Sequence, residues 1–263
     1  MIRNALIIGG ASFVLMLGSA AGVAALAGPV ILKDGWTIPF DSQDRGQIHS
    51  RHLGSVGKQA SPLVSRQLAW TGDTLTLDLP IDVTYVQGPV ARIEVSGPAA
   101  VVDRLRVDAG RISLADGDGN LNADSLTIDR NGIRVHSYAD QTRIVVTAPN
   151  ISQIKLDGSG DLEIQAFDQP TLSLAINGSG DVSAEGKVAV LSLTSAGSGE
   201  AQLDDLAAKN ADLMISGSGN AVVTAKNVVT IALSGSGDVS LQAQPASLTA
   251  NTSGSGTVQH DYE

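Results

Sequence analysis

The tripeptide Gly-Ser-Gly recurs six times in the second half of this 263-residue chain, and its spacing constrains the fold more than any other feature. Successive copies start 20, 19, 20, 18 and 19 residues apart. Such a narrow spread is typical of stacked repeats, in which every unit has nearly the same circumference. We expect the glycines of these tripeptides to form the turns of the repeat: Gly158, Gly160, Gly178, Gly180, Gly197, Gly199, Gly217, Gly219, Gly235, Gly237, Gly254 and Gly256.

Residues on both sides of each Gly-Ser-Gly alternate between apolar and polar. Four residues before the first glycine stand Ile154, Leu174, Leu193, Leu213, Ile231 and Ala250, and four residues after it stand Leu162, Val182, Ala201, Ala221, Val239 and Val258. A period of two indicates strands with one buried face, joined by turns in which glycine adopts a positive φ. A meander of hairpins also alternates, but hairpins repeat every ~8–12 residues. The pattern therefore predicts an all-β chain, a β-solenoid similar to a parallel β-helix, with rungs of about 19 residues.

The chain divides into three parts by pattern. Residues 151–263 carry the regular repeats, and residues 66–150 show strand-like alternation interrupted by proline and glycine, which predicts irregular opening rungs on the same stack. The alternating pairs include Ile133 and Val135. Residues 28–65 have no sustained period and are interpreted as a linker or irregular entry segment.

The N-terminus has the features of an export signal. Arg3 precedes an apolar stretch, and Ala25-Leu26-Ala27 has the small-x-small form of a cleavage site, so residues 1–27 are interpreted as a signal peptide. Retention of the same segment as a membrane anchor is the alternative. Both interpretations predict an exported protein in the periplasm, in the cell envelope or at the cell surface. Contact with a membrane is expected only if the N-terminal segment stays uncleaved.

Charge and cysteine content exclude several classes of function. The 17 basic and 27 acidic residues give a net charge of −10 without a lysine or arginine cluster, so nucleic acid is not an expected partner. The chain has no cysteine, which excludes disulfides, thiolate metal sites and cysteine nucleophiles. Aromatic residues make up only 3%, so the core has to consist of aliphatic side chains.

The polar residue after each Gly-Ser-Gly is the first candidate site. Stacking in register places these side chains in one column, whose oxygens are ligands that calcium accepts. The alternative, which we favour, is that they serve the turns by accepting backbone N–H groups. The candidates in the column are Asp161, Asp181, Glu200, Asn220 and Asp238.

A second candidate calcium site is the loop with Asp116, Asp118 and Asn120 at alternate positions. Leu121 and Thr127 occupy positions where a calcium loop requires glycine and glutamate, so an ordinary loop is favoured. No metal or other cofactor is expected. The glycine-flanked serines do not form a nucleophile elbow, and the four histidines show no metal-ligand spacing, so no catalytic residue is assigned.

Residues 66 to about 260 resemble the GIN-domain family of auto-transporter adhesin heads. The resemblance is carried by the Val-Thr-Tyr-Val-Gln-Gly stretch at 83–88 and by Gly-Ser-Gly-Asp units beginning at Gly158, Gly178 and Gly235. The remaining copies depart from the motif, with Glu200, Asn220 and Thr257 in place of aspartate. The resemblance implies a β-solenoid in a secreted or envelope protein.

These observations favour a non-catalytic, adhesin-like envelope protein whose solenoid surface binds a glycan or another cell-surface component. One alternative is a polysaccharide lyase or hydrolase, because paired carboxylates can supply acid and base. The other is a structural envelope component that self-assembles through its terminal rungs. The irregular front and the His260-Asp261-Tyr262 end are interpreted as caps, so a monomer is expected.

Overall fold

The computed structural model describes residues 36–39, 62–115, 125–129, 132–136 and 139–262, which fall into two compact units. The smaller unit contains an antiparallel sheet in the order β1-β8-β9, formed by Trp36–Pro39, Ser125–Asp129 and Gly132–His136. Strand β1 lies in the segment interpreted as a linker. Ile133 and Val135 belong to this sheet and not to the solenoid, which differs from the expected continuous stack.

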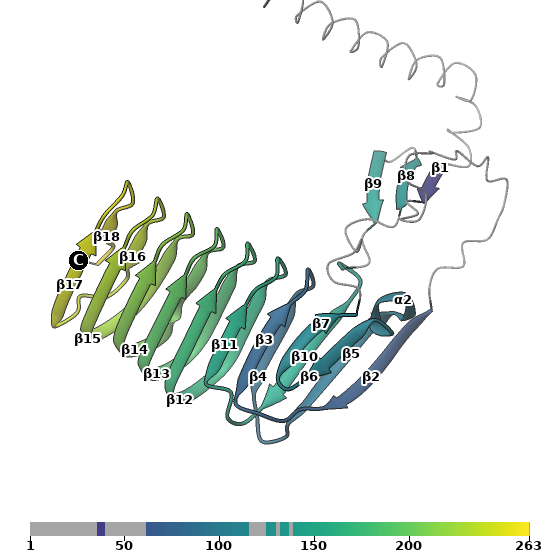
Figure 1. The fold of residues 1–263 in the computed structure, drawn as a ribbon, viewed down its shortest axis with the longest axis horizontal. Coiled ribbons are helices and arrows are strands. Elements are labelled where there is room, and N and C mark those ends of the chain that lie inside the picture. Colours follow the sequence, from purple (N-terminus) through teal and green to yellow (C-terminus); the bar gives the residue numbers. More distant parts are fainter. Residues whose placement is uncertain (1–35, 40–61, 116–124, 130–131, 137–138, 263) are drawn as a thin grey trace, which may run out of the picture. The chain divides into compact units, whose positions relative to one another are not determined.

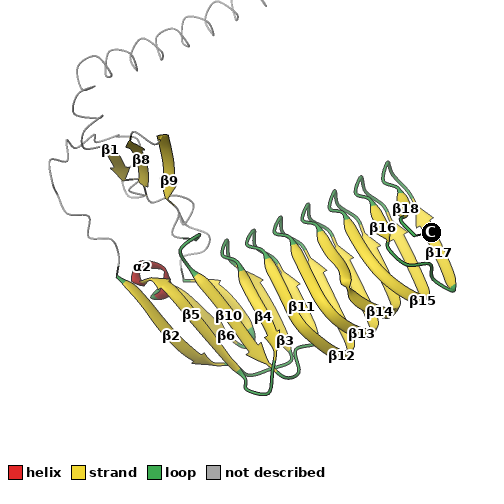
Figure 2. Ribbon diagram, turned by 180° about the vertical axis from the view of Figure 1, so that it is seen from behind, coloured by secondary structure: helices red, strands yellow, loops and turns green. Residues whose placement is uncertain are grey.

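The larger unit contains a 15-stranded sheet that winds into a β-solenoid (Figures 1 and 2). Its regular part consists of β11 (Gln153–Leu156), β12 (Leu162–Ile176), β13 (Val182–Ser195), β14 (Ala201–Ile215), β15 (Ala221–Leu233), β16 (Val239–Leu241), β17 (Ser247–Thr252) and β18 (Val258–His260). Each pairs in parallel with its equivalent in the next coil. Parallel pairing excludes the hairpin meander and confirms the predicted solenoid.

The predicted apolar columns form the interior. Leu174 pairs with Ile154 on one side and Leu193 on the other, and the column continues through Leu213 to Ile231. These five side chains are at most 1% exposed. We call this column of stacked aliphatic side chains the aliphatic ladder. It buries the apolar surface that stabilises the fold, which the few aromatic residues could not supply.

The coils differ in length at the corner opposite the Gly-Ser-Gly turns. Every turn between strands has five residues, whereas β12 to β15 contain 15, 14, 15 and 13 residues. The strand register shifts at the corner, for example between Ile164 and Phe167, where Ala166 has a φ of 55°. The 18- to 20-residue spread of the sequence repeat is thus absorbed by bulges, and the turns stay aligned.

The front of the solenoid mixes parallel and antiparallel strands. It consists of β2 (Leu63–Ala69), β3 (Thr74–Asp78), β4 (Val83–Gln87), β5 (Arg92–Pro98), α2 (Ala99–Val102), β6 (Leu105–Asp108), β7 (Arg111–Leu114) and β10 (Arg143–Ala148). Strands β3 and β4 pair in parallel with β11 and β12, and so form the first coil. The pairs β2–β5, β5–β10 and β6–β7 are antiparallel.

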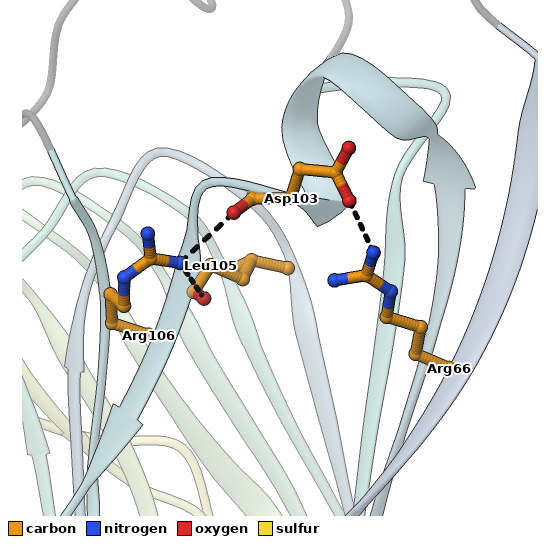
Figure 3. Close-up of polar contacts among 4 residues, drawn as sticks. All are labelled: Arg66, Asp103, Leu105 and Arg106. Atoms are coloured by element: carbon orange, nitrogen blue, oxygen red, sulfur yellow. Dashed lines mark hydrogen bonds and ion pairs between the residues drawn. The ribbon is translucent and has the colours of Figure 1, made fainter.

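Polar contacts around the short helix α2 hold this front part together (Figure 3). Arg66 of β2 forms an ion pair with Asp103, the residue that ends α2. Arg106 of β6 donates to the backbone carbonyls of Asp103 and Leu105, both at 2.9 Å. Trp70, which is 3% exposed, packs into the core of this region. Side-chain contacts between residues far apart in the sequence therefore help to hold the front together.

Candidate functional site

The Gly-Ser-Gly turns lie directly over one another along one edge of the solenoid. A Cβ atom added to any of the twelve glycines would lie only 1.8–2.3 Å from a carbonyl oxygen of the turn beneath it. Only Gly254 among the twelve has a positive φ. The expectation that positive φ requires glycine here is therefore wrong for the other eleven; the carbonyl of the preceding turn occupies the space of the side chain.

In four of the six copies, the residue after the Gly-Ser-Gly joins its turn to the next one. Oδ1 of Asp161 accepts the backbone N–H of Asp181 at 2.8 Å, and Oδ1 of Asp181 accepts that of Glu200 at 2.7 Å. Asn220 does the same for Asp238 at 2.9 Å. These side chains act as the turn-stabilising groups expected from the favoured alternative.

Two further members of this column, Asp82 and Thr257, were not among the candidates proposed from the sequence. Asp82 accepts the N–H of Asp161 at 3.0 Å, so the column begins one coil before the first Gly-Ser-Gly. At the other end, both the N–H and the hydroxyl of Thr257 donate to Asp238, and they hold the pKa of that carboxyl below its ordinary value. Asp82 follows Leu79-Pro-Ile without glycine, and only the alternation of Leu75, Leu77 and Leu79 pointed to this coil.

The candidate calcium ligands that lie in the described residues do not form a cluster that could bind a metal ion. Within the described ranges, no group of three or more His, Asp or Glu side chains is placed to hold a metal ion. One oxygen of Asp161, Asp181 and Asp238 is already engaged with the next turn. The second candidate loop, with Asp116, Asp118 and Asn120, lies outside the described residues.

A shallow trough runs beside this column over the first halves of the coils. It comprises two adjoining depressions of about 360 and 210 Å³, which share Glu163, Ser183 and Gln202. These three residues pair in register across β12, β13 and β14, so their outward side chains form the floor. We call this feature the acidic trough; its carboxylates are those of Asp82, Asp161, Glu163, Asp181, Glu185, Asp204 and Asp205.

The acidic trough has one sign of charge and an open surface. Neither depression is lined by a lysine or arginine. Glu163, Glu185, Asp204 and Asp205 are exposed, and Nε2 of Gln165 donates to Oε1 of Glu163 at 2.8 Å. A row of hydrogen-bond acceptors on rigid parallel strands suits a ligand that offers hydroxyl or cationic donors at several points.

Most of the acidic trough was not predicted from the sequence, because its residues come from two different parts of each coil, the turn and the irregular corner. The turn column was foreseen, but Glu185, Asp204 and Asp205 lie near the irregular corner, where the repeat has no fixed register. The available signal was Glu163, which alternates with buried Leu162 and Ile164 and so had to face outward.

The fold defines the class of protein: a parallel β-solenoid closed at its front by antiparallel strands. The chain belongs to the family described as "Putative auto-transporter adhesin, head GIN domain", whose model matches residues 73–245. The family resemblance carried by the Gly-Ser-Gly-Asp units is thereby confirmed.

The solved structures that match this chain include one from Bacteroides fragilis and two from Parabacteroides species. A putative adhesin from Bacteroides fragilis has 18% identity and a TM-score of 0.54, with 76% of this chain and 97% of that chain covered. A putative lipid binding protein from Parabacteroides distasonis has 18% identity and a TM-score of 0.41, with 75% and 96% covered. A putative adhesin from Parabacteroides merdae has 13% identity and a TM-score of 0.39, with 75% and 95% covered.

The first of these supports the fold assignment. No curated protein sequence matches the chain. In the part that the structure describes, none of the helical segments is long and apolar enough to cross a bilayer; the proposed signal peptide at 1–27 lies outside that part.

Proposed function

We propose that this protein is a non-catalytic, exported binding protein that holds a glycan or another cell-surface polymer along its acidic trough. The observation that carries the proposal is the trough itself, in which two adjoining depressions are lined by seven carboxylates and no basic side chain. Its floor repeats once per coil, at about 4.8 Å. A regular row of acceptors matches a ligand whose donor groups also recur along its length.

Export is part of the same proposal. The basic residue, apolar stretch and Ala25-Leu26-Ala27 site favour secretion, with a membrane anchor as the alternative outcome. The adhesin description of the family agrees with a position in the periplasm, envelope or cell surface. Calcium is not required by the proposal, because the turn carboxylates already act as acceptors for backbone N–H groups.

Binding to an array of glycans and envelope polymers tests the proposal, with charge-removing variants that preserve the turns. Asp181→Asn removes a charge but keeps the acceptor for the next N–H, as Asn220 does naturally in the same column. Glu163→Gln likewise removes a charge but keeps an acceptor oxygen, here on the floor of the acidic trough. Each variant is expected to weaken binding about tenfold, since a hydrogen bond to a charged group contributes ~1.5–3 kcal/mol.

Asp212→Asn is the matched control. Asp212 is exposed on the second half of β14 and is not among the residues that line the acidic trough, so its loss should leave binding unchanged. Equal weakening by all three variants would show that only net charge matters and would remove the trough from the proposal. If glycans were cleaved with a turnover that Asp181→Asn abolishes, a polysaccharide lyase or hydrolase would replace the binding function.

A further inference from the structure

The last rung of the solenoid leaves two strand edges open. Strands β17 and β18 pair with β15 and β16 on one side, and no described residue pairs with their other side. Figure 1 shows both strands at the C-terminal end of the stack, opposite the end closed by β2, β5 and α2. An unpaired edge presents backbone donors and acceptors to any strand of matching geometry.

The direction of these backbone groups follows from the parallel register. The N–H of Ser253 bonds to Leu233 O at 2.7 Å and that of Asp261 bonds to Leu241 O at 2.9 Å, so both point into the stack. Because N–H and C=O groups alternate in direction along a parallel strand, the intervening residues point outward. In β17 and β18 these are Leu248, Ala250, Thr252, Val258 and His260.

This rung lacks two of the usual protections of a strand edge, charged side chains and a β-bulge. The sequence contains no Asp, Glu, Lys or Arg from Val239 to His260, although the chain carries a net charge of −10. Strand β17 pairs without a bulge, and Pro245 precedes it. The two described acids next to this rung are both engaged: Asp238 accepts hydrogen bonds from Thr257 in its turn, and Asp261 accepts hydrogen bonds from Ser240 and Gln242, one coil back.

The expected cap at residues 260–262 covers only part of the rung. The Tyr262 ring packs edge-on against His260 and is partly buried against the core. Ala250 and Thr252 of β17 stay exposed, and Leu248 is only half-buried. Their equivalents in β15, Ile231, Leu233 and Val229, are at most 1% exposed.

We infer that this rung is a docking edge for the same rung of a second copy of the chain. The rung presents two edges at once, joined by a five-residue turn, and an extended peptide would cover only one of them. A second solenoid end covers both. Strands β2 and β6 at the front are also paired on one side only, but they contain Arg66, Arg106 and Asp108, and charged side chains protect a strand edge from pairing. Uncharged rungs also meet without the repulsion that the acidic remainder of two copies would exert.

Contact between identical ends closes the assembly at two copies. Such an interface is isologous, so it buries both open rungs and leaves none for further growth. The product is a dimer with its two front ends facing away from each other, in contrast to the monomer expected from the sequence.

Sedimentation of the full chain over a range of concentrations tests the inference, with far-UV circular dichroism to verify folding. The wild type is expected to double its mass with rising concentration. Ala250→Lys places a charge on the open rung and should raise the dimer dissociation constant at least about tenfold. Ala232→Lys adds the same charge to the exposed outer surface of β15 and should leave dimerisation unchanged.

If Ala250→Lys fails to fold, Thr252→Lys at the end of the same strand takes its place. A wild type that stays monomeric up to millimolar concentration would overturn the inference. So would a dimer that both lysine variants of the last rung leave intact. Both of these results would leave the proposed function of the acidic trough untouched, because the glycan-binding experiment does not depend on whether the protein is a monomer or a dimer.

Discussion

The regular coils and the front of this solenoid solve the same packing problem with different means. In the regular coils each Gly-Ser-Gly turn rests on the carbonyls of the one before it, so every turn after the first needs glycine. The turn at Leu79-Pro80-Ile81-Asp82 is the first of the column: Gly158 lies over Leu79 O and Gly160 over Ile81 O. It supports the next turn and needs no glycine itself. Glycine therefore recurs in these turns because each of them packs against the backbone carbonyls of the preceding turn.

The two regions also differ in how polar groups are used. In the regular coils, equivalent residues cap one another, as Asp161, Asp181 and Asn220 do. In the front, contacts are specific to one pair of residues, as between Arg66 and Asp103 or between the Tyr85 hydroxyl and Ala148 O. A repeating pattern is therefore visible in the sequence only where each coil packs against an equivalent coil.

The largest expected effect tests whether the aliphatic ladder holds the regular coils together. Leu213 is 0% exposed, whereas its neighbour Met214 is 56% exposed on the outer surface. Leu213→Asp buries a charge without a partner and should cost at least about 4 kcal/mol of unfolding free energy. Met214→Asp should change it by less than about 0.5 kcal/mol. Urea unfolding of both variants measures the difference; similar stability in both would mean that the ladder is not the interior.

The next largest effect concerns the glycine turns. Gly197→Ala would place a Cβ 1.9 Å from Gly178 O, which the stacked backbone relieves only by shifting. We expect a loss of about 3 kcal/mol, the upper end for overpacking. Ser198→Ala changes the exposed residue between the two glycines and is the control, with little expected effect. Thermal unfolding compares the two; a stable Gly197→Ala protein would argue against close stacking of the turns.

The same contrast explains what the sequence could predict. The six glycine pairs and the alternation around Leu174 and Leu213 identified the coil, its period and its interior column. Those features depend on residues about one coil apart, each in the same environment. A period in the sequence is therefore enough to place them.

The front could not be placed in this way because its pairs are formed once. Strand β4 pairs with β10 and β12, both more than fifty residues away, and β2 pairs with β5 in the antiparallel sense. The sheet of β1, β8 and β9 joins segments that lie more than eighty residues apart in the sequence. Part of the acidic trough was missed for a related reason, since Glu185 and Asp204 lie where the coil length varies.

A smaller effect, in the front, comes from one buried hydroxyl. Tyr85 is 0% exposed and donates to Ala148 O at 3.0 Å, and burial raises its pKa from 10.0 to about 12. Tyr85→Phe should cost about 1 kcal/mol, because the Ala148 carbonyl loses one of its two donors and keeps only the N–H of Gly88 at 3.2 Å. Equilibrium unfolding at neutral pH measures this loss, and the conservative ring keeps the packing.

The pH dependence of the same variant sharpens the test. The unfolded chain loses the Tyr85 proton near pH 10, before the folded protein does, so the stability contributed by this group is complete below pH 10 and falls as the pH approaches 12. The wild type should therefore lose more stability than Tyr85→Phe between these values. Identical pH profiles would show that Tyr85 titrates equally in both states.

The smallest effect concerns Ser195, the one buried polar residue in the described regular coils. Ser195 is 2% exposed, pairs in register with Ile176 and Ile215, and its hydroxyl has no hydrogen-bond partner among the described residues. Ser195→Ala removes an unsatisfied buried group at the cost of little volume, so stability should rise by about 0.5–1 kcal/mol. Urea unfolding against Ser198→Ala, whose serine is exposed, gives the comparison. A destabilised Ser195→Ala protein would mean that the hydroxyl is bonded within the coil, and that the regular column, like the front, contains a specific polar contact.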